Sequence, residues 1–293
     1  MLVLDAGARV TQLRFLPDGR LLVGTWAAGD ATLAIWPLSD GPILHIPLGH
    51  RQVWDEPNRV AVTPAGDRLY TTFGTLLTRD AADGRELPDG PSGAASQVIV
   101  SPDGARVVSA YREASGDTVL DGHAAGGRAW RATDPHAAHL AGFLPDGDRF
   151  LVVGNYAVAV RSFDARREFA AVPYPYSSLS HLQPSPDGRH LGVIGRHSLF
   201  VYDTAVLGKP RRLSGSGNNG NFVGFAFHPA GKTLAVIHGG PTLVKLYDLD
   251  TLKPRSKLNW KVGPLTCVAF SADGLLGAAG SDDGRVVVWD VDE

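Results

Sequence analysis

Residues 265–290 read LTCVAFSADGLLGAAGSDDGRVVVWD, in which glycine-containing turns separate short apolar runs. An apolar run from Thr266 leads into the turn Ser271-Ala272-Asp273-Gly274, and the last run ends on Trp289-Asp290. Apolar runs of this length, bounded by Asp and Gly, are typical of short β-strands joined by tight turns. The segment therefore predicts antiparallel β-structure.

The same turn recurs along the whole chain in the form Pro-Asp/Ala-Gly, and only the last copy lacks the proline. Proline presets φ for the first corner of such a turn, and glycine supplies the positive φ at its exit. Successive copies lie 38 to 47 residues apart, and a period of about 40 to 45 residues is typical of a four-stranded propeller blade. The seven copies end at Gly19, Gly66, Gly104, Gly147, Gly188, Gly231 and Gly274.

Each period holds three apolar runs and a fourth, more polar run, such as residues 166–170 or 254–258. The last period lacks its fourth run, whereas Leu2-Val3-Leu4 precede the first inner run at residues 10–15. Sharing these strands in one blade would remove two open sheet edges. We therefore predict an all-β protein with one domain over residues 1–293, a seven-bladed β-propeller of four-stranded antiparallel blades. The N-terminal strand is expected to join the C-terminal blade and close the ring.

This pattern resembles the WD-repeat β-propeller family over essentially the whole chain. The best match is residues 268–290, and Gly49-His50 stands where the family has a Gly-His dipeptide. The family's buried network of His, Ser/Thr, Asp and Trp is complete in no repeat: the last has Asp283 and Trp289 but no matching His. The repeats are degenerate, and the resemblance implies a scaffold for protein or peptide partners.

The composition argues against several classes of partner and compartment. A formal charge of −2 and a pI near 6.5 give no global field that would draw the chain to nucleic acid or an anionic membrane. The single cysteine cannot form an internal disulfide, the start does not resemble a signal peptide, and no apolar run reaches the roughly 18 residues of a membrane span. We expect a cytoplasmic, monomeric propeller with a protein or peptide partner and without nucleic-acid or membrane partners.

Motifs for cofactor or metal chemistry are weak. Residues 215–220 match G-x-G-x-x-G, but a strand-like run follows instead of the helix that a dinucleotide site requires. His136 and His139 are three apart, a spacing that shares one face of a helix, and His123 lies nearby, but this stretch precedes a strand and the single thiol is far away in sequence. Cys267 is expected to be a buried, inert thiol. No cofactor, metal or catalytic residue is predicted. A propeller enzyme, either a hydrolase or a lactonase with a carboxylate pair at the central channel mouth, is the alternative.

Charge is unevenly distributed along the chain. Residues 196–261 contain ten Lys/Arg and three acidic residues, so this stretch carries +7 and the remainder −9. Lysine on outer strands discourages aggregation between sheets, so a solvated edge is the first interpretation. A docking patch for an acidic partner is the second.

The resemblance also implies a working face. In WD-repeat propellers the loops from outer to next inner strand, and from second to third strand, open opposite the Pro-Asp-Gly turns. Loops at 49–58, 172–181 and 214–221 fit these places and hold Trp, Tyr and Arg, which often carry interface energy. Trp54 and Trp260 have an alternative role as caps of the core between blades. The predicted partner-binding residues are Arg51, Trp54, Tyr174, Tyr176, Asn218, Asn219 and Trp260, with Trp54, Tyr174 and Tyr176 as anchors.

Overall fold

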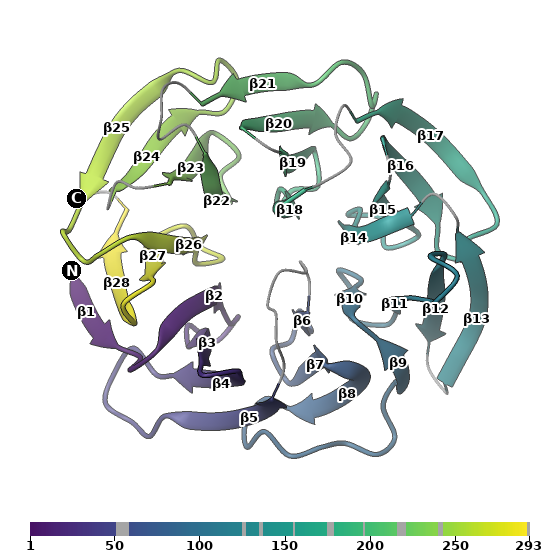
Figure 1. The fold of residues 1–293 in the computed structure, drawn as a ribbon, viewed down its shortest axis with the longest axis horizontal. Helices are drawn as coiled ribbons and strands as arrows, with labels where there is room; N and C mark the ends of the chain where they lie inside the picture. The colour runs from purple at the N-terminus through teal and green to yellow at the C-terminus, as the bar shows by residue number, and fades with distance from the viewer. Residues whose placement is uncertain are drawn as a thin grey trace. The chain divides into compact units, whose positions relative to one another are not determined.

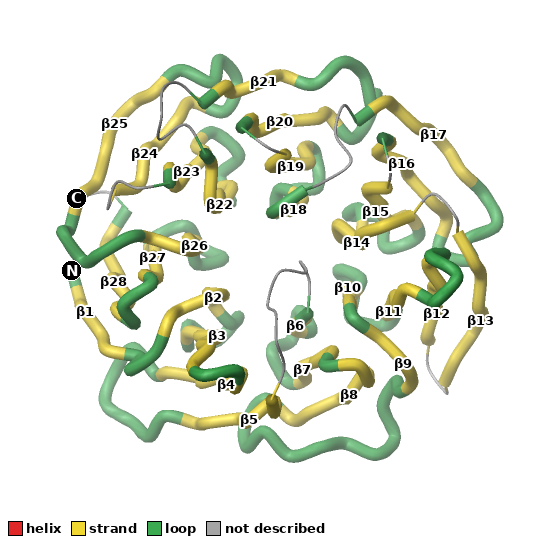
Figure 2. Tube along the Cα trace, in the orientation of Figure 1, coloured by secondary structure: helices red, strands yellow, loops and turns green. Residues whose placement is uncertain are grey.

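The computed structural model describes residues 1–50, 59–124, 127–134, 137–154, 156–174, 179–195, 197–215, 221–239 and 243–291. Strands and loops make up this part of the chain (Figure 2). No helix that could span a membrane occurs among these residues. The described strands, β1 to β28, form seven four-stranded sheets.

The chain divides into two compact units, and the first contains Met1–Trp54, Ser185–Val201 and Arg211–Glu293. Three of its sheets have the orders β2-β3-β4-β5, β22-β23-β24-β25 and β1-β28-β27-β26. Their strands are β1 (Leu2–Asp5), β2 (Arg9–Phe15), β3 (Leu21–Ala27), β4 (Asp30–Trp36), β5 (Leu44–His50), β22 (Phe222–Phe227), β23 (Thr233–His238), β24 (Leu243–Asp248), β25 (Pro254–Asn259), β26 (Leu265–Phe270), β27 (Leu276–Ser281) and β28 (Arg285–Asp290).

The second unit contains Asp55–Pro184 and Tyr202–Pro210. Three of its sheets have the orders β6-β7-β8-β9, β10-β11-β12-β13 and β14-β15-β16-β17. Their strands are β6 (Val60–Val62), β7 (Arg68–Thr72), β8 (Gly74–Asp80), β9 (Gly93–Ala95), β10 (Gln97–Val100), β11 (Val107–Arg112), β12 (Thr118–Ala124), β13 (Gly127–Asp134), β14 (Ala137–Phe143), β15 (Arg149–Gly154), β16 (Ala157–Ser162) and β17 (Glu168–Pro173). The remaining sheet consists of β18 (His181–Pro184), β19 (His190–Gly195), β20 (Ser198–Asp203) and β21 (Arg211–Ser214).

The N-terminal strand completes the C-terminal blade, as predicted. β1 pairs antiparallel with β28, placing Leu2 opposite Val288 and Leu4 opposite Val286 (Figure 1). The backbone N–H of Ala6 extends the pairing by donating to the carbonyl of Gly284 at 2.7 Å. This sheet therefore has four strands although the last sequence period supplies three.

The core consists of apolar clusters where one sheet faces the next. In the first unit, Leu199 and Phe225 share a cluster with other residues of β20, β22 and β23. In the second, Val108 of β11 packs in a cluster with Phe150 of β15. A sheet covered on both faces needs nearly continuous apolar strands, which explains why the inner runs of each period lack strict alternation.

The recurring turns have glycine at positive φ, and three of them also have a serine–aspartate hydrogen bond, at Ser101, Ser185 and Ser271. In one copy, Gly104 has φ +74° and donates its N–H to the carbonyl of Ser101 at 2.9 Å. The Ser101 hydroxyl donates to Asp103 at 2.5 Å, and this bond is the main reason that the pKa of Asp103 is lowered. The turns are therefore structural in the way the sequence predicts.

Replacing Gly104 with valine should destabilise the protein by about 1 to 2 kcal/mol, because a β-branched residue is strained at positive φ. An added Cβ at Gly104 would also lie 3.3 Å from Pro64. Urea unfolding checks this through the midpoint at unchanged m-value. Gly208→Val is the matched control, since an added Cβ there has open space and no positive φ. Equal shifts for both variants would contradict the assignment.

Candidate functional site

Tyr174 does not offer the exposed anchor predicted for it. Its relative exposure is 1%, and it is among the largest fully buried side chains of the described chain. Its backbone N–H donates to the carbonyl of Tyr156 at 2.7 Å, so the segment after β17 is held against the start of β16. The ring contributes to the core and is not available to a partner in this conformation.

Trp260 packs against the core instead of standing free on a loop. Its ring centroid lies 4.6 Å from that of Trp289, with an angle of 37° between the planes. Both rings join the cluster that contains Val262 and Leu265, and Trp260 stays partly exposed at its margin. The geometry favours the alternative considered for this residue, a cap on the core between blades.

Five other predicted partner-binding residues lie outside the described residues. Their partner-binding role therefore stays a prediction, and the site described below lies in other parts of the chain. The five are Arg51, Trp54, Tyr176, Asn218 and Asn219.

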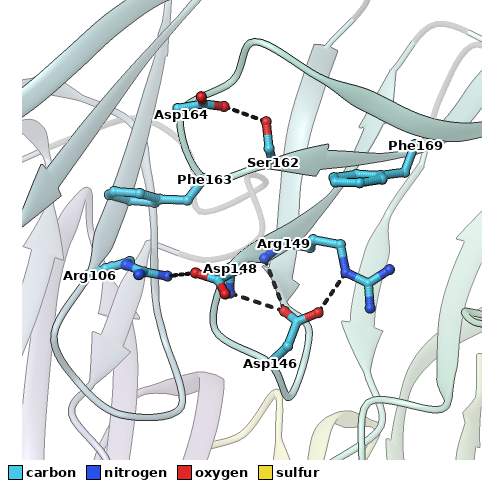
Figure 3. A pocket seen from close by; sticks show the side chains of 8 residues that line it. All are labelled: Arg106, Asp146, Asp148, Arg149, Ser162, Phe163, Asp164 and Phe169. Atoms are coloured by element: carbon cyan, nitrogen blue, oxygen red, sulfur yellow. Dashed lines mark hydrogen bonds and ion pairs between the residues drawn. The ribbon is translucent and has the colours of Figure 1, made fainter.

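A hollow of about 520 Å³ lies on the β14–β17 sheet, at the end that carries the Pro-Asp-Gly turn (Figure 3). The predicted working loops belong to the other end of the blades, so sequence reasoning missed this site. We name it the β14–β17 hollow. Its walls come from the β14–β15 turn, the β16–β17 turn, β17 and the neighbouring sheet β10–β13. The lining residues are Arg106, Asp146, Asp148, Arg149, Ser162, Phe163, Asp164 and Phe169.

Arg106 joins two turns on one side of the hollow. Its guanidinium donates to the carbonyl of Gly147 at 2.7 Å and to the carboxylate of Asp148. The same group lies 5.1 Å from the centre of the Phe163 ring, a cation–π distance. Because Arg106 follows one Pro-Asp-Gly turn and Asp148 follows the next, this wall exists only when the two turns pack together.

Phe169 forms the other side of the hollow and is 43% exposed. The guanidinium groups of Arg149 and Arg167 lie 5.6 Å and 4.7 Å from the centre of its ring. Arg149 also donates to the carboxylate of Asp146 at 2.6 Å. The exposed ring is thus held in place by two arginines, one of which is itself fixed by an ion pair.

Two carboxyl groups of the hollow are held in the ionised form. Burial raises the pKa of Asp146, but hydrogen bonds from the Arg149 side chain and from two backbone N–H groups outweigh it, so the net pKa is lowered. The pKa of Asp164 is lowered mainly by the Ser162 hydroxyl, which donates at 2.5 Å. A general acid needs a raised pKa to keep its proton near neutral pH. Neither group is therefore suited to act as a general acid.

The candidate metal and thiol residues have other roles in the structure. His123 is buried with its Nε2 3.3 Å from the Ser109 hydroxyl, and His139 Nδ1 lies 3.3 Å from the Gln97 amide. Within the described residues, no group of three His, Cys, Asp or Glu side chains could hold a metal ion; His136 lies outside them. Burial raises the pKa of Cys267 to about 12, as expected for an inert thiol.

Comparison with known proteins connects the repeat pattern to a family. Residues 253–290 match the model of the WD domain, G-beta repeat. The resemblance to WD-repeat proteins is confirmed. Over 46 residues the chain is 46% identical to guanine nucleotide-binding protein subunit beta-like protein 1 of Mus musculus. That alignment covers 16% of this chain and 14% of the mouse protein's length.

A solved β-propeller domain has the same fold as the whole chain. The β-propeller domain of Cps50 (Swd1) from Myceliophteria thermophila superposes with a TM-score of 0.76, covering 99% of this chain and 98% of that domain. The sequence identity is 15%, so the likeness concerns the fold. The predicted fold class, a seven-bladed β-propeller of four-stranded antiparallel blades, is confirmed.

Proposed function

We propose that this chain is a non-catalytic interaction module that holds a protein or peptide partner. It acts as a monomeric, cytoplasmic propeller in which residues 1–293 form one domain, without a cofactor and without nucleic-acid or membrane partners. The likeness to WD-repeat propellers supports a scaffold role, and the ionised carboxyls of the β14–β17 hollow are unsuited to general-acid catalysis.

The observation that carries the proposal is the exposed Phe169 ring beside the β14–β17 hollow. Aromatic residues, phenylalanine included, and arginine are enriched at protein interfaces. A ring already fixed by Arg149 and Arg167 loses little conformational freedom when a partner covers it. The hollow beside it, at about 520 Å³, has room for a side chain of that partner.

Phe169→Ala should weaken binding of the partner, once captured by affinity purification, by about 1 to 2 kcal/mol, or roughly tenfold. Isothermal titration calorimetry measures the change. Tyr156→Ala is the matched control, because Tyr156 is an aromatic residue 60% exposed between β15 and β16, at the other end of the same sheet. Wild-type affinity in Phe169→Ala would contradict the proposed site.

The Tyr156→Ala control also shows at which end of the blades the partner binds. Loss of affinity in Tyr156→Ala, Trp54→Ala or Tyr176→Ala, with Phe169→Ala unaffected, would place the partner on the loops predicted from the sequence. In both outcomes the protein is an interaction module. Turnover of an ester or lactone by the purified chain would instead support the enzymatic alternative.

A further inference from the structure

The two outer strands of the β22–β25 sheet carry two lysines that face each other. Lys245 of β24 and Lys257 of β25 are direct partners in the antiparallel register. Side chains at such positions start from Cβ atoms about 5 Å apart, and like charges there are destabilising. In the described part of the chain, neither lysine has an ion pair with a carboxylate.

The acidic residue of the same strand as Lys245, Asp248, is engaged by other groups. Asp248 accepts hydrogen bonds from the Thr251 N–H at 2.9 Å and hydroxyl at 2.8 Å, and from the Arg255 side chain. These bonds lower the pKa of Asp248 to about 2. The pKa of His238 is lowered to about 4, mainly by burial and to a smaller extent by the positive charge of Lys245. The charge of Lys245 therefore also acts on the neighbouring strand.

Arginines of the same basic stretch are committed to local structure. Arg211 donates to the backbone carbonyls of Leu249 and Asp250, and Arg212 donates to the Ser198 hydroxyl at 2.9 Å. Arg255 is held by Asp248, as described above. These three arginines of the basic stretch thus have structural roles, whereas Lys245 and Lys257 are the two lysines of the stretch that face each other in the register.

β25 is also the edge strand of its sheet. Five of its six residues are exposed, and Leu258 alone is partly buried against the core. An edge strand presents a row of unpaired backbone N–H and C=O groups, to which an extended peptide can add as a further strand. Lysine on an edge strand discourages unwanted pairing, but two lysines directly opposite each other also cost stability.

We propose that β25, together with Lys245 and Lys257, is a docking strip for an extended acidic segment of a partner protein. Carboxylates of that segment would neutralise the facing ammonium groups, so binding relieves a repulsion present in the free protein. We call this surface the lysine strip. It lies on a different sheet from the β14–β17 hollow and does not depend on the function proposed for that hollow.

The test uses fluorescein-labelled octaglutamate and fluorescence anisotropy at low ionic strength. Lys245→Gln/Lys257→Gln should weaken binding about fivefold, as expected for one exposed and one partly exposed charge contact. Lys232→Gln/Lys253→Gln removes the same charge from exposed positions of the same blade and should change the affinity less than about twofold. Equal weakening by both variants, or no binding by the wild type, would overturn the lysine strip.

Two further measurements sharpen the result. Lys257→Gln should raise the melting temperature by about 2 °C, because it removes a like-charge pair. If this variant instead aggregates more and binds octaglutamate as the wild type does, the lysines only protect the edge of the sheet. Labelled oligothymidylate is the second probe, and tighter binding of it through the same lysines would overturn the peptide ligand. Phe169→Ala should leave octaglutamate binding unchanged, so failure of the hollow and failure of the strip are distinguishable.

Discussion

Replacing Arg131 with methionine is expected to lower the free energy of unfolding by about 3 kcal/mol, because it would leave a buried carboxylate without its partner. Asp121 lies in β12 and is 2% exposed. Arg131 lies directly opposite it in β13 and donates to both carboxylate oxygens, at 2.8 Å and 2.6 Å. This two-pronged pairing is what permits an ionised group inside the sheet.

Chemical denaturation of matched variants isolates that effect. Arg128→Met changes an exposed arginine of the same strand and should shift stability by less than about 0.5 kcal/mol. Asp121→Leu/Arg131→Met removes both charges and should recover most of the loss, since it leaves no buried carboxylate without its partner. A loss in Arg131→Met no larger than in Arg128→Met would contradict the role given to the pair.

Deleting residues 1–8 is expected to lower the melting temperature by about 5 °C or more and to reduce solubility. The deletion removes β1 and exposes the edge of β28, where Val286 and Val288 are 0% and 5% exposed in the intact protein. Differential scanning calorimetry and light scattering measure the two effects.

Point substitutions test whether pairing and packing of β1 cause that loss. Leu4 packs against a core cluster, whereas Leu2 is 41% exposed. Leu4→Ser should therefore cost more stability than Leu2→Ser, which serves as the control. Unchanged melting after deletion, or equal effects of the two serine variants, would show that the shared blade contributes little.

The blades could be predicted from the sequence because each turn is determined by residues that are adjacent in the chain. A glycine at positive φ can be predicted from the turn around it, as at Gly104, and the repeat of that turn sets the number of sheets. The bounds of the outer strands were predicted less precisely: the run predicted at residues 166–170 is a strand from Glu168 to Pro173. Polar edge strands lack the apolar pattern that fixes a register.

The site depends on contacts that sequence patterns do not contain. Tyr174 directly follows a strand, and nothing local decides whether such a ring turns inward or outward; the structure buries it. Arg106 and Asp148 form one wall of the β14–β17 hollow but come from different repeats. Their turns were interpreted as structural, which they are, although their packing against each other also creates a surface.

The pairing of β1 with β28 has a consequence for how the protein is made. β1 is synthesised long before its partner strand β28, because Leu4 pairs with Val286. Until then β1 has no partner strand, and three-stranded β26–β28 has an open edge once it is synthesised. Contacts so distant in sequence form slowly, so the nascent chain passes through a stage that chaperones would be expected to recognise.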